Sequence, residues 1–234
     1  MVIHRVSVVM PVYNGELHVA EAIESVLGQT QPPDELVVVD DGSTDGTPQI
    51  LDRYGSRIVR LRQSHAGAAA AVNRGLGVAT GDVLGFQDAD DIWCRDKLSR
   101  QLESLDARPE IDAVFGMACQ FVSPEVPESR KAALAPKIGI GRGELRPCML
   151  IRRGAFHRIG PFDPALSATA FIEWLGRAKR MGLRYSVLDE VVLLRRLHLS
   201  NYSRVNLKER DQDMLLGLHS LIRARRAQKC DPLT

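Results

Sequence analysis

Three aspartates, Asp88, Asp90 and Asp91, lie within four residues and directly follow the apolar segment 83–86. Carboxylates this close repel one another, so bringing them together raises the free energy unless a cation lies among them. Hard divalent cations prefer oxygen ligands, and Mg2+ is commonly held by one or two carboxylates together with substrate phosphates. The cluster therefore indicates a metal and phosphate site; the alternative is a solvated acidic turn that caps the next helix.

A second acidic pair, Asp40 and Asp41, ends another apolar run at residues 35–39. Open α/β sheets bind ligands outside the carboxyl ends of their strands, so two acidic loops at one edge indicate a shared crevice. These carboxylates are suited to hydrogen bonds with base N–H groups or ribose hydroxyls. The alternative is a turn that leads into a helix beginning at Thr47 and Pro48, with the Thr47 hydroxyl as its cap.

Four residues in the second half of the chain are further candidates. His198 follows an apolar segment and is suited to a metal shell or a diphosphate, although a single histidine is more often structural. Arg195 and Arg196 carry planar guanidinium groups that match phosphate oxygens, with surface ion pairs as the alternative. Glu173, beside Trp174, is the candidate general base; the alternative is a solvated helix residue.

The segments around these residues alternate between strand and helix patterns, which predicts a mainly parallel sheet with crossover helices. Pro11 is expected to end the first strand. The proline- and glycine-rich residues 123–146 are expected to form an irregular substrate-side loop. Strands are predicted at 6–10, 35–39, 58–61, 83–86 and 112–122, with a strand pair near 184–197; helices are predicted at 16–28, from 47, 66–80, near 98–105, 169–181 and 205–228.

Composition limits the classes of protein. The 234 residues fit one domain, and a net charge of +2 argues against a nucleic-acid partner. The four cysteines have neither metal-ligand nor redox spacing, which is typical of reduced thiols in the cytoplasm. No apolar run is long enough to cross a bilayer. The basic residues near 223–229 are expected either at a solvated helix end or in peripheral contact with anionic lipid at the inner face of the membrane.

Four blocks in a fixed order resemble family 2 glycosyltransferases. They are residues 6–15 (VSVVMPVYNG), 37–47 (VVVDDGSTDGT), 67–75 (GAAAAVNRG, followed by Gly81-Asp82) and 86–93 (FQDADDIW), and residues 149–163 (MLIRRGAFHRIGPFD) are similar to the family's acceptor-side segment. The resemblance implies one α/β domain of the GT-A fold over residues 1–234. Its nucleotide-sugar half would be 1–110, its acceptor-side half 111–204, and its C-terminal helix and tail 205–234.

The resemblance also implies a site. Pro11, Tyr13 and Glu16 would lie near the nucleotide, Asn73 would belong to the donor side, and Asp41 with Asp40 would bind the base, commonly uracil. Asp88, Asp90 and Asp91 match the metal motif, with Asp90 toward the ribose or diphosphate and Asp91 toward Mn2+ or Mg2+, and His198 would close the metal site. The implied activity is that of a hexosyltransferase, which moves a sugar from a nucleotide-diphosphate donor, with inversion, to a hydroxyl acceptor.

The sequence departs from the family pattern in two places. The family often has a Glu-Asp pair that supplies the catalytic base, and this pair falls on Ala170 and Phe171, which leaves Glu173 as the nearest carboxylate. Val72 stands where the family often has arginine. The Gln-x-x-Arg-Trp motif of processive synthases is absent from the sequence. A nucleotide-sugar-binding protein without catalysis is the alternative, and a nucleotidyltransferase ranks lower because residues 11–16 contain no lysine.

Overall fold

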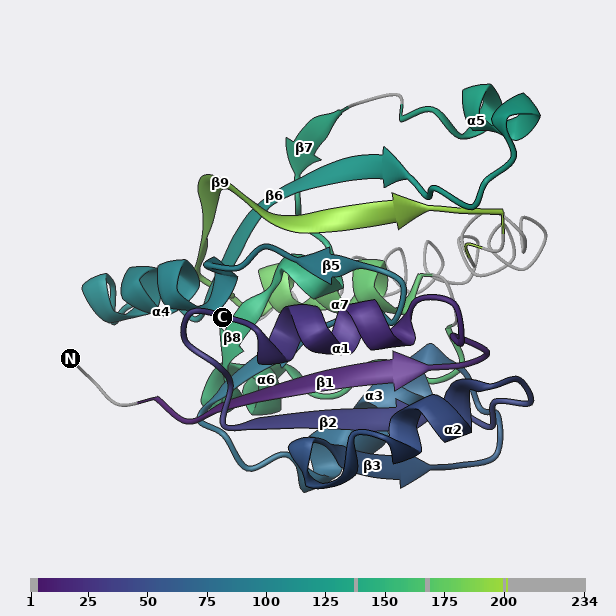
Figure 1. Ribbon diagram of the computed structural model, residues 1–234. Coiled ribbons are helices and arrows are strands. Elements are labelled where there is room, and N and C mark those ends of the chain that lie inside the picture. Colours follow the sequence, from purple (N-terminus) through teal and green to yellow (C-terminus); the bar gives the residue numbers. More distant parts are fainter. Residues whose placement is uncertain (1–3, 137–138, 167–168, 200, 202–234) are drawn as a thin grey trace.

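The computed structural model describes residues 4–136, 139–166, 169–199 and 201. In these residues one nine-stranded sheet forms the centre of the fold, with strand order β3-β2-β1-β4-β8-β6-β9-β5 and with β7 paired to β6 (Figure 1). The helix predicted at 205–228 lies outside the described residues. None of the helices in the described part of the chain is long and apolar enough to span a bilayer.

The N-terminal part of the sheet is parallel, as predicted. Its strands are β1 (Val6–Val12), β2 (Glu35–Asp40), β3 (Val59–Arg62) and β4 (Val83–Phe86); its helical segments are α1 (Val19–Leu27), α2 (Thr47–Asp52), η1 (Gly55–Arg57) and α3 (Ala68–Val78). Figure 1 shows α1 and α2 in front of this part of the sheet and α3 behind it. Because β1 is covered on both faces, all its residues are buried, which explains its continuous apolar sequence.

The prediction that Pro11 ends the first strand is wrong, because β1 continues to Val12. Alternate residues of a strand direct their backbone groups to opposite neighbours. Val9 O accepts a hydrogen bond from Gln87 N on the β4 side, and Val12 O accepts one from Asp41 N on the β2 side. Pro11 faces the same side as Val9, where the pairing with β4 has ended. Its missing N–H therefore removes no bond from the sheet.

The second half of the chain extends the sheet beyond β4. Antiparallel β8 joins β4 to β6, and β9 then pairs with β6 in parallel. The elements are β5 (Ile92–Trp93), α4 (Lys97–Ala107), β6 (Ala113–Val122), α5 (Glu128–Leu134), β7 (Ile140–Arg142), η2 (Arg146–Cys148), β8 (Leu150–Arg152), α6 (Arg153–Ile159), α7 (Ala170–Arg180) and β9 (Tyr185–Leu197). In Figure 1, β1, β6 and β9 run in the same direction, so their carboxyl ends lie toward one side of the molecule.

Two predictions for this half are corrected. The strand pair predicted near 184–197 is the single strand β9 (Tyr185–Leu197), and its register with β6 is shifted between Phe115 and Ala118. The predicted irregular loop 123–146 contains helix α5 and strand β7, whose backbone pairs with β6. Both corrections arise because β6 is long enough to provide a pairing edge that local sequence patterns do not reveal.

Candidate active site

The predicted aspartate cluster lies in a tight turn at the carboxyl end of β4. Asp91 N donates to Asp88 O at 3.3 Å, and the buried Gln87 donates from Nε2 to Asp91 O at 2.7 Å. This turn gives each aspartate a different environment. The predicted cluster is therefore one segment of backbone with three separate side-chain sites.

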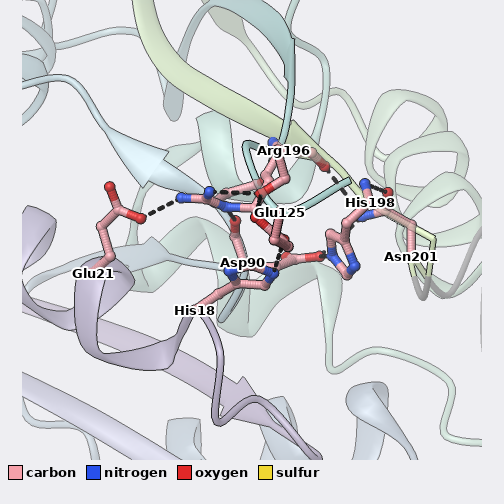
Figure 2. A network of polar contacts seen from close by, with 9 residues as sticks. His18, Glu21, Asp90, Glu125, Arg196, His198 and Asn201 are labelled. Carbon is pink, nitrogen blue, oxygen red and sulfur yellow. Dashed lines mark hydrogen bonds and ion pairs between the residues drawn. The ribbon is translucent and has the colours of Figure 1, made fainter. Parts of the chain in front are cut away.

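Asp90 is joined to the C-terminal end of β9 (Figure 2). Its Oδ2 lies 2.9 Å from His198 Nε2 and accepts a hydrogen bond from Asn201 Nδ2 at 3.2 Å. Burial opposes ionisation of Asp90, but the hydrogen bond and charge of His198 outweigh it, so the pKa of this carboxyl is lowered. The predicted association of Asp90 with His198 is thus present in the structure.

Asp91 lies in the protein interior, with 3% of its surface exposed. Its Oδ1 accepts a hydrogen bond from the backbone N–H of Arg196 at 2.9 Å. Burial, followed by the charges of Asp90 and Asp88, raises its pKa well above the ordinary value. Among the described residues, no group of three or more His, Cys, Asp and Glu side chains could hold a metal ion. The structure therefore brings Asp90 and His198 together but leaves Asp91 apart from them.

The Asp90 and His198 pair is compatible with Mn2+ or Mg2+. Asp90 Oδ2 and His198 Nε2, which lie 2.9 Å apart, would both hold the cation. A carboxylate oxygen and an imidazole nitrogen are ordinary ligands of Mn2+. Diphosphate oxygens and water would supply the remaining positions, as is usual for such ions at phosphate sites.

Arg146 contacts the third aspartate, and sequence reasoning missed it. Its Nη2 forms an ion pair with Asp88 Oδ1, and both side chains are largely covered. Arg146 begins η2, which contacts β4 and β6, so residues 58 positions apart meet at the end of β4. The only sequence signal is an arginine at the end of the segment predicted to be a substrate-side loop.

The neighbouring arginines of β9 occupy different environments. Arg196, with 4% exposure, donates from Nε to Asp90 O at 2.9 Å and from Nη1 to Ser123 Oγ at 3.0 Å. Its Nη2 pairs with Glu21, as Figure 2 shows, so each guanidinium nitrogen has a protein partner. Arg195 is partly exposed and contributes positive charge near Asp91. Of the two predicted phosphate ligands, Arg195 is the more accessible.

His18 extends the network toward α1. Its ring lies 4.9 Å from that of His198, and its Nε2 lies 3.1 Å from Glu125 Oε1. Burial, followed by the charge of Arg196, lowers the pKa of His18. The sequence shows no pattern that links these residues, because they follow β1, β6 and β9 separately and meet only in the folded chain.

The second acidic pair lies at the end of β2, which is separated from β4 by β1 in the sheet. Asp40 is fully buried, and its Oδ1 accepts a hydrogen bond from Ser43 N at 2.8 Å. Its Oδ2 has no hydrogen-bond partner among the described residues, and Arg62 Nε lies 3.6 Å away. The carboxylate of Asp41 is surrounded by nitrogen atoms from the segment before α3. These are Gln63 Nε2 at 2.7 Å, Ala66 N at 2.9 Å, Gly67 N at 2.8 Å and His65 Nδ1 at 2.9 Å.

Residues 13–16, which follow β1, contact the loop after β2 and the segment before α3. Glu16 Oε2 accepts a hydrogen bond from Gly46 N at 2.7 Å, and Tyr13 is half exposed with its ring stacked on His65. Pro11 is buried at the end of β1. The prediction that the Thr47 hydroxyl caps α2 is wrong, because this oxygen accepts the Gly15 N–H at 2.9 Å and α2 has no side-chain cap.

Asn73, predicted to belong to the donor side, and Glu173, the predicted base, both bind the segment after α6, Glu173 through Arg177. Asn73 clamps the backbone of Phe162, accepting its N–H at 3.1 Å and donating to its carbonyl at 2.8 Å. Glu173 is buried on α7, where its two oxygens pair with Arg177 at 3.2 and 3.3 Å. Arg177 also donates to the carbonyls of Ile159 and Pro161, so the pair ties α7 to the segment after α6.

The family model for glycosyl transferase family 2 matches residues 7–160, which is more than half of the chain. The chain belongs to this family. The predicted family is therefore confirmed, and the matched segment contains both acidic loops and Arg146 but ends before Glu173 and His198.

Known proteins extend this result. The UDP-Glc:alpha-D-GlcNAc-diphosphoundecaprenol beta-1,3-glucosyltransferase WfgD of Escherichia coli is 42% identical over 115 residues, which cover 48% of this chain and 45% of WfgD. The mannosyltransferase PcManGT of Pyrobaculum calidifontis, solved with GDP-Man and Mn2+, superposes with a TM-score of 0.69 at 26% identity, covering 95% of this chain and 65% of PcManGT. TarS 1-349 of S. aureus in complex with UDP superposes with a TM-score of 0.65 at 24% identity, and the match covers 82% of this chain and 60% of TarS 1-349.

These structural neighbours confirm the predicted GT-A fold. The chain spans only part of the length of its curated relatives. The match covers 41% of the putative teichuronic acid biosynthesis glycosyltransferase TuaG of Bacillus subtilis and 45% of WfgD. The family and fold are thus shown for a region that is shorter than these proteins.

Proposed function

We propose that this member of glycosyl transferase family 2 transfers a sugar from a UDP-sugar to a hydroxyl acceptor, with inversion and with a requirement for Mn2+ or Mg2+. The contact between Asp90 Oδ2 and His198 Nε2 at the end of β4 carries the proposal. It supplies two ligands of suitable chemistry at the sheet edge where open α/β folds bind nucleotides. The names of WfgD, with UDP-Glc, and of PcManGT, with GDP-Man and Mn2+, support it.

Different residues would bind the nucleoside, the cation and the donor's sugar and phosphates. Asp40, Asp41 and Tyr13 would bind the nucleoside, while Asp90 and His198 would hold the cation against the diphosphate. A divalent cation there would offset the negative charge that develops on the leaving diphosphate. Asp88, oriented by Arg146, would bind hydroxyl groups of the donor, and Arg195 would reach its phosphates.

Glu173 stays the predicted general base. A base must take the acceptor proton as the hydroxyl attacks the anomeric carbon from the side opposite the diphosphate. The Arg177 guanidinium pairs with both carboxylate oxygens of Glu173 and holds the side chain in the interior. Three unpaired cysteines in the described chain fit a reducing compartment, so we place the reaction in the cytoplasm.

The direct test is release of nucleoside diphosphate. The protein is incubated with UDP-glucose, UDP-N-acetylglucosamine, UDP-galactose and GDP-mannose, with Mn2+ or with EDTA. We expect Mn2+-dependent release of UDP from at least one UDP-sugar by slow hydrolysis, and faster release when an acceptor is present. Activity that is equal in EDTA, or release from GDP-mannose alone, contradicts the proposal.

A second candidate function is nucleotide-sugar binding without transfer. The specific observation in its favour is that Ala170 and Phe171 lie at the start of α7, while the nearest carboxylate, Glu173, is paired with Arg177. Calorimetry that shows metal-dependent UDP binding, together with no UDP release from any donor, would establish this function instead.

A further inference from the structure

The imidazole of His65 makes two contacts at the site proposed for the nucleobase. Its ring stacks on Tyr13 with centroids 4.0 Å apart and an interplanar angle of 28°. Its Nδ1 lies 3.2 Å from the backbone carbonyl oxygen of Asp41, with which it forms a hydrogen bond, and 2.9 Å from Oδ2 of the same residue. A planar nitrogen heterocycle that stacks on an aromatic ring and places a ring nitrogen beside a carboxylate has features of a pyrimidine base with an N3–H group.

Four nitrogen atoms of the protein lie within 3 Å of the Asp41 carboxylate oxygens. A carboxylate offers about four lone-pair positions. Gln63 Nε2 and Ala66 N donate to Oδ1, whereas Gly67 N and His65 approach Oδ2. A base N–H can therefore reach Asp41 only if one of these partners leaves.

The two stacked rings also exclude a base between them. A ring inserted between Tyr13 and His65 requires a separation of about 7 Å, because each stacked contact takes about 3.5 Å. The observed separation of their centroids is 4.0 Å. Both features of the predicted base site, the stacking surface and the carboxylate, are thus engaged by one side chain of the protein.

His65 is a partner of Asp41 that can leave without a change in the backbone. Its side chain is 55% exposed, whereas Ala66 and Gly67 bind through backbone N–H groups at the start of α3. The backbone of His65 packs closely against Gly42, where an added Cβ would lie 2.9 Å from His65 N. Rotation of the side chain alone would release the ring and leave residues 63–67 in place.

We infer that His65 occupies the nucleobase subsite of the free protein as an internal substitute for the base, and that a uracil ring displaces it. The inference rests on the proposed function, because it takes the donor to be a uridine nucleotide. Displacement frees one lone pair of Asp41 for the uracil N3–H and exposes the face of Tyr13 for stacking. His65 thereby lowers donor affinity and favours bases that can replace both of its contacts.

The test measures nucleotide affinity by calorimetry, with uridine alone and with UDP plus Mn2+. We expect His65→Ala to bind both ligands about three- to tenfold more tightly than the wild type, the factor equivalent to one net hydrogen bond. The gain should be the same for uridine and UDP, because it arises at the base. His65→Ser, which also lacks the ring, should show the same direction, and Tyr13→Ala should weaken both ligands.

His157→Ala is the matched control, because His157 is an exposed histidine on α6 and its variant should keep wild-type affinity. Unchanged or weaker binding of uridine by folded His65→Ala and His65→Ser overturns the inference. A gain for UDP without a gain for uridine also overturns it. If neither the wild type nor His65→Ala binds any uridine ligand, the proposed donor is wrong; wild-type binding without a gain in the variants refutes only the role of His65.

Discussion

Asp90 Oδ2 lies 2.9 Å from His198 Nε2, although 108 positions separate the two residues in the sequence. The next residue along the chain, Asp91, faces the interior and binds the backbone N–H of Arg196 instead. The same turn thus directs one carboxylate to the proposed metal site and another to the junction with β9. An acidic motif alone does not reveal which of its members has which role.

The two neighbouring aspartates should respond differently to the same substitution. We expect Asp90→Asn to weaken Mn2+ binding, measured by calorimetry with UDP present, by about 100-fold or more, since outer-shell partners alone are worth 10- to 100-fold. Asp91→Asn should keep Mn2+ binding, because its amide oxygen can still accept the Arg196 N–H and because burial already disfavours the charged form of Asp91. The opposite order would restore Asp91 as the principal ligand.

The neighbouring arginines of β9 provide a second matched pair. Arg196→Met should lower the free energy of unfolding by about 2–4 kcal/mol, since the change leaves Ser123 and the Asp90 carbonyl without their buried donor. Arg195→Met should change it by less than about 0.5 kcal/mol and raise the donor KM instead. Urea denaturation followed by circular dichroism measures the first effect, and equal destabilisation by the two substitutions would contradict this division.

The sequence was sufficient for the parallel half of the fold. Buried parallel strands need apolar residues on both faces, so β1 and β2 appear as continuous apolar runs that local reasoning can locate. The acidic loops follow the apolar runs of β2 and β4, so their position at one edge of the sheet also follows from the sequence. Pro11 misled the prediction because its effect depends on which neighbouring strand its missing N–H would face.

The second half depended on contacts that no local pattern encodes. The strand pair predicted near 184–197 is the single strand β9, in which Asp189 and Glu190 are exposed positions. Arg146 meets Asp88, and His18 meets His198, only after separate strands have paired. Such partners are determined by the order of strands in the sheet, so composition and spacing near each residue do not identify them.

The Glu173 and Arg177 pair allows the predicted base to be separated from a structural role. Arg177→Met should lower the free energy of unfolding by about 1–3 kcal/mol, because Glu173 and the Ile159 and Pro161 carbonyls lose a common donor. If Glu173 takes the acceptor proton, Glu173→Gln lowers kcat at least about 100-fold while Arg177→Met retains activity. Thermal unfolding and UDP release measure the two effects; similar kcat values in both variants would refute Glu173 as the base.

Lys97 gives the stability of the protein a specific pH dependence. The side chain is 1% exposed, donates from Nζ to Gln101 Oε1 at 2.5 Å, and lies 4.3 Å from the centroid of the Trp93 ring. Burial lowers the pKa of Lys97 from 10.5 to about 7. The unfolded chain therefore binds a proton between these pH values that the folded chain does not bind, so stability falls as the pH decreases from 10.5 toward 7 and this contribution levels off below pH 7.

Lys97→Met removes this linkage. The free energy of unfolding of the variant minus that of the wild type should be roughly 2–4 kcal/mol larger at pH 6.5 than at pH 9.5. The reason is that the wild type loses the stability linked to Lys97 as the pH falls over that interval, whereas the variant does not. Lys131→Met, a substitution on the exposed side of α5, should show the same difference from the wild type at both pH values. Urea denaturation at the two pH values measures both variants, and a Lys97→Met difference that does not change with pH would show that Lys97 keeps its charge in the folded protein.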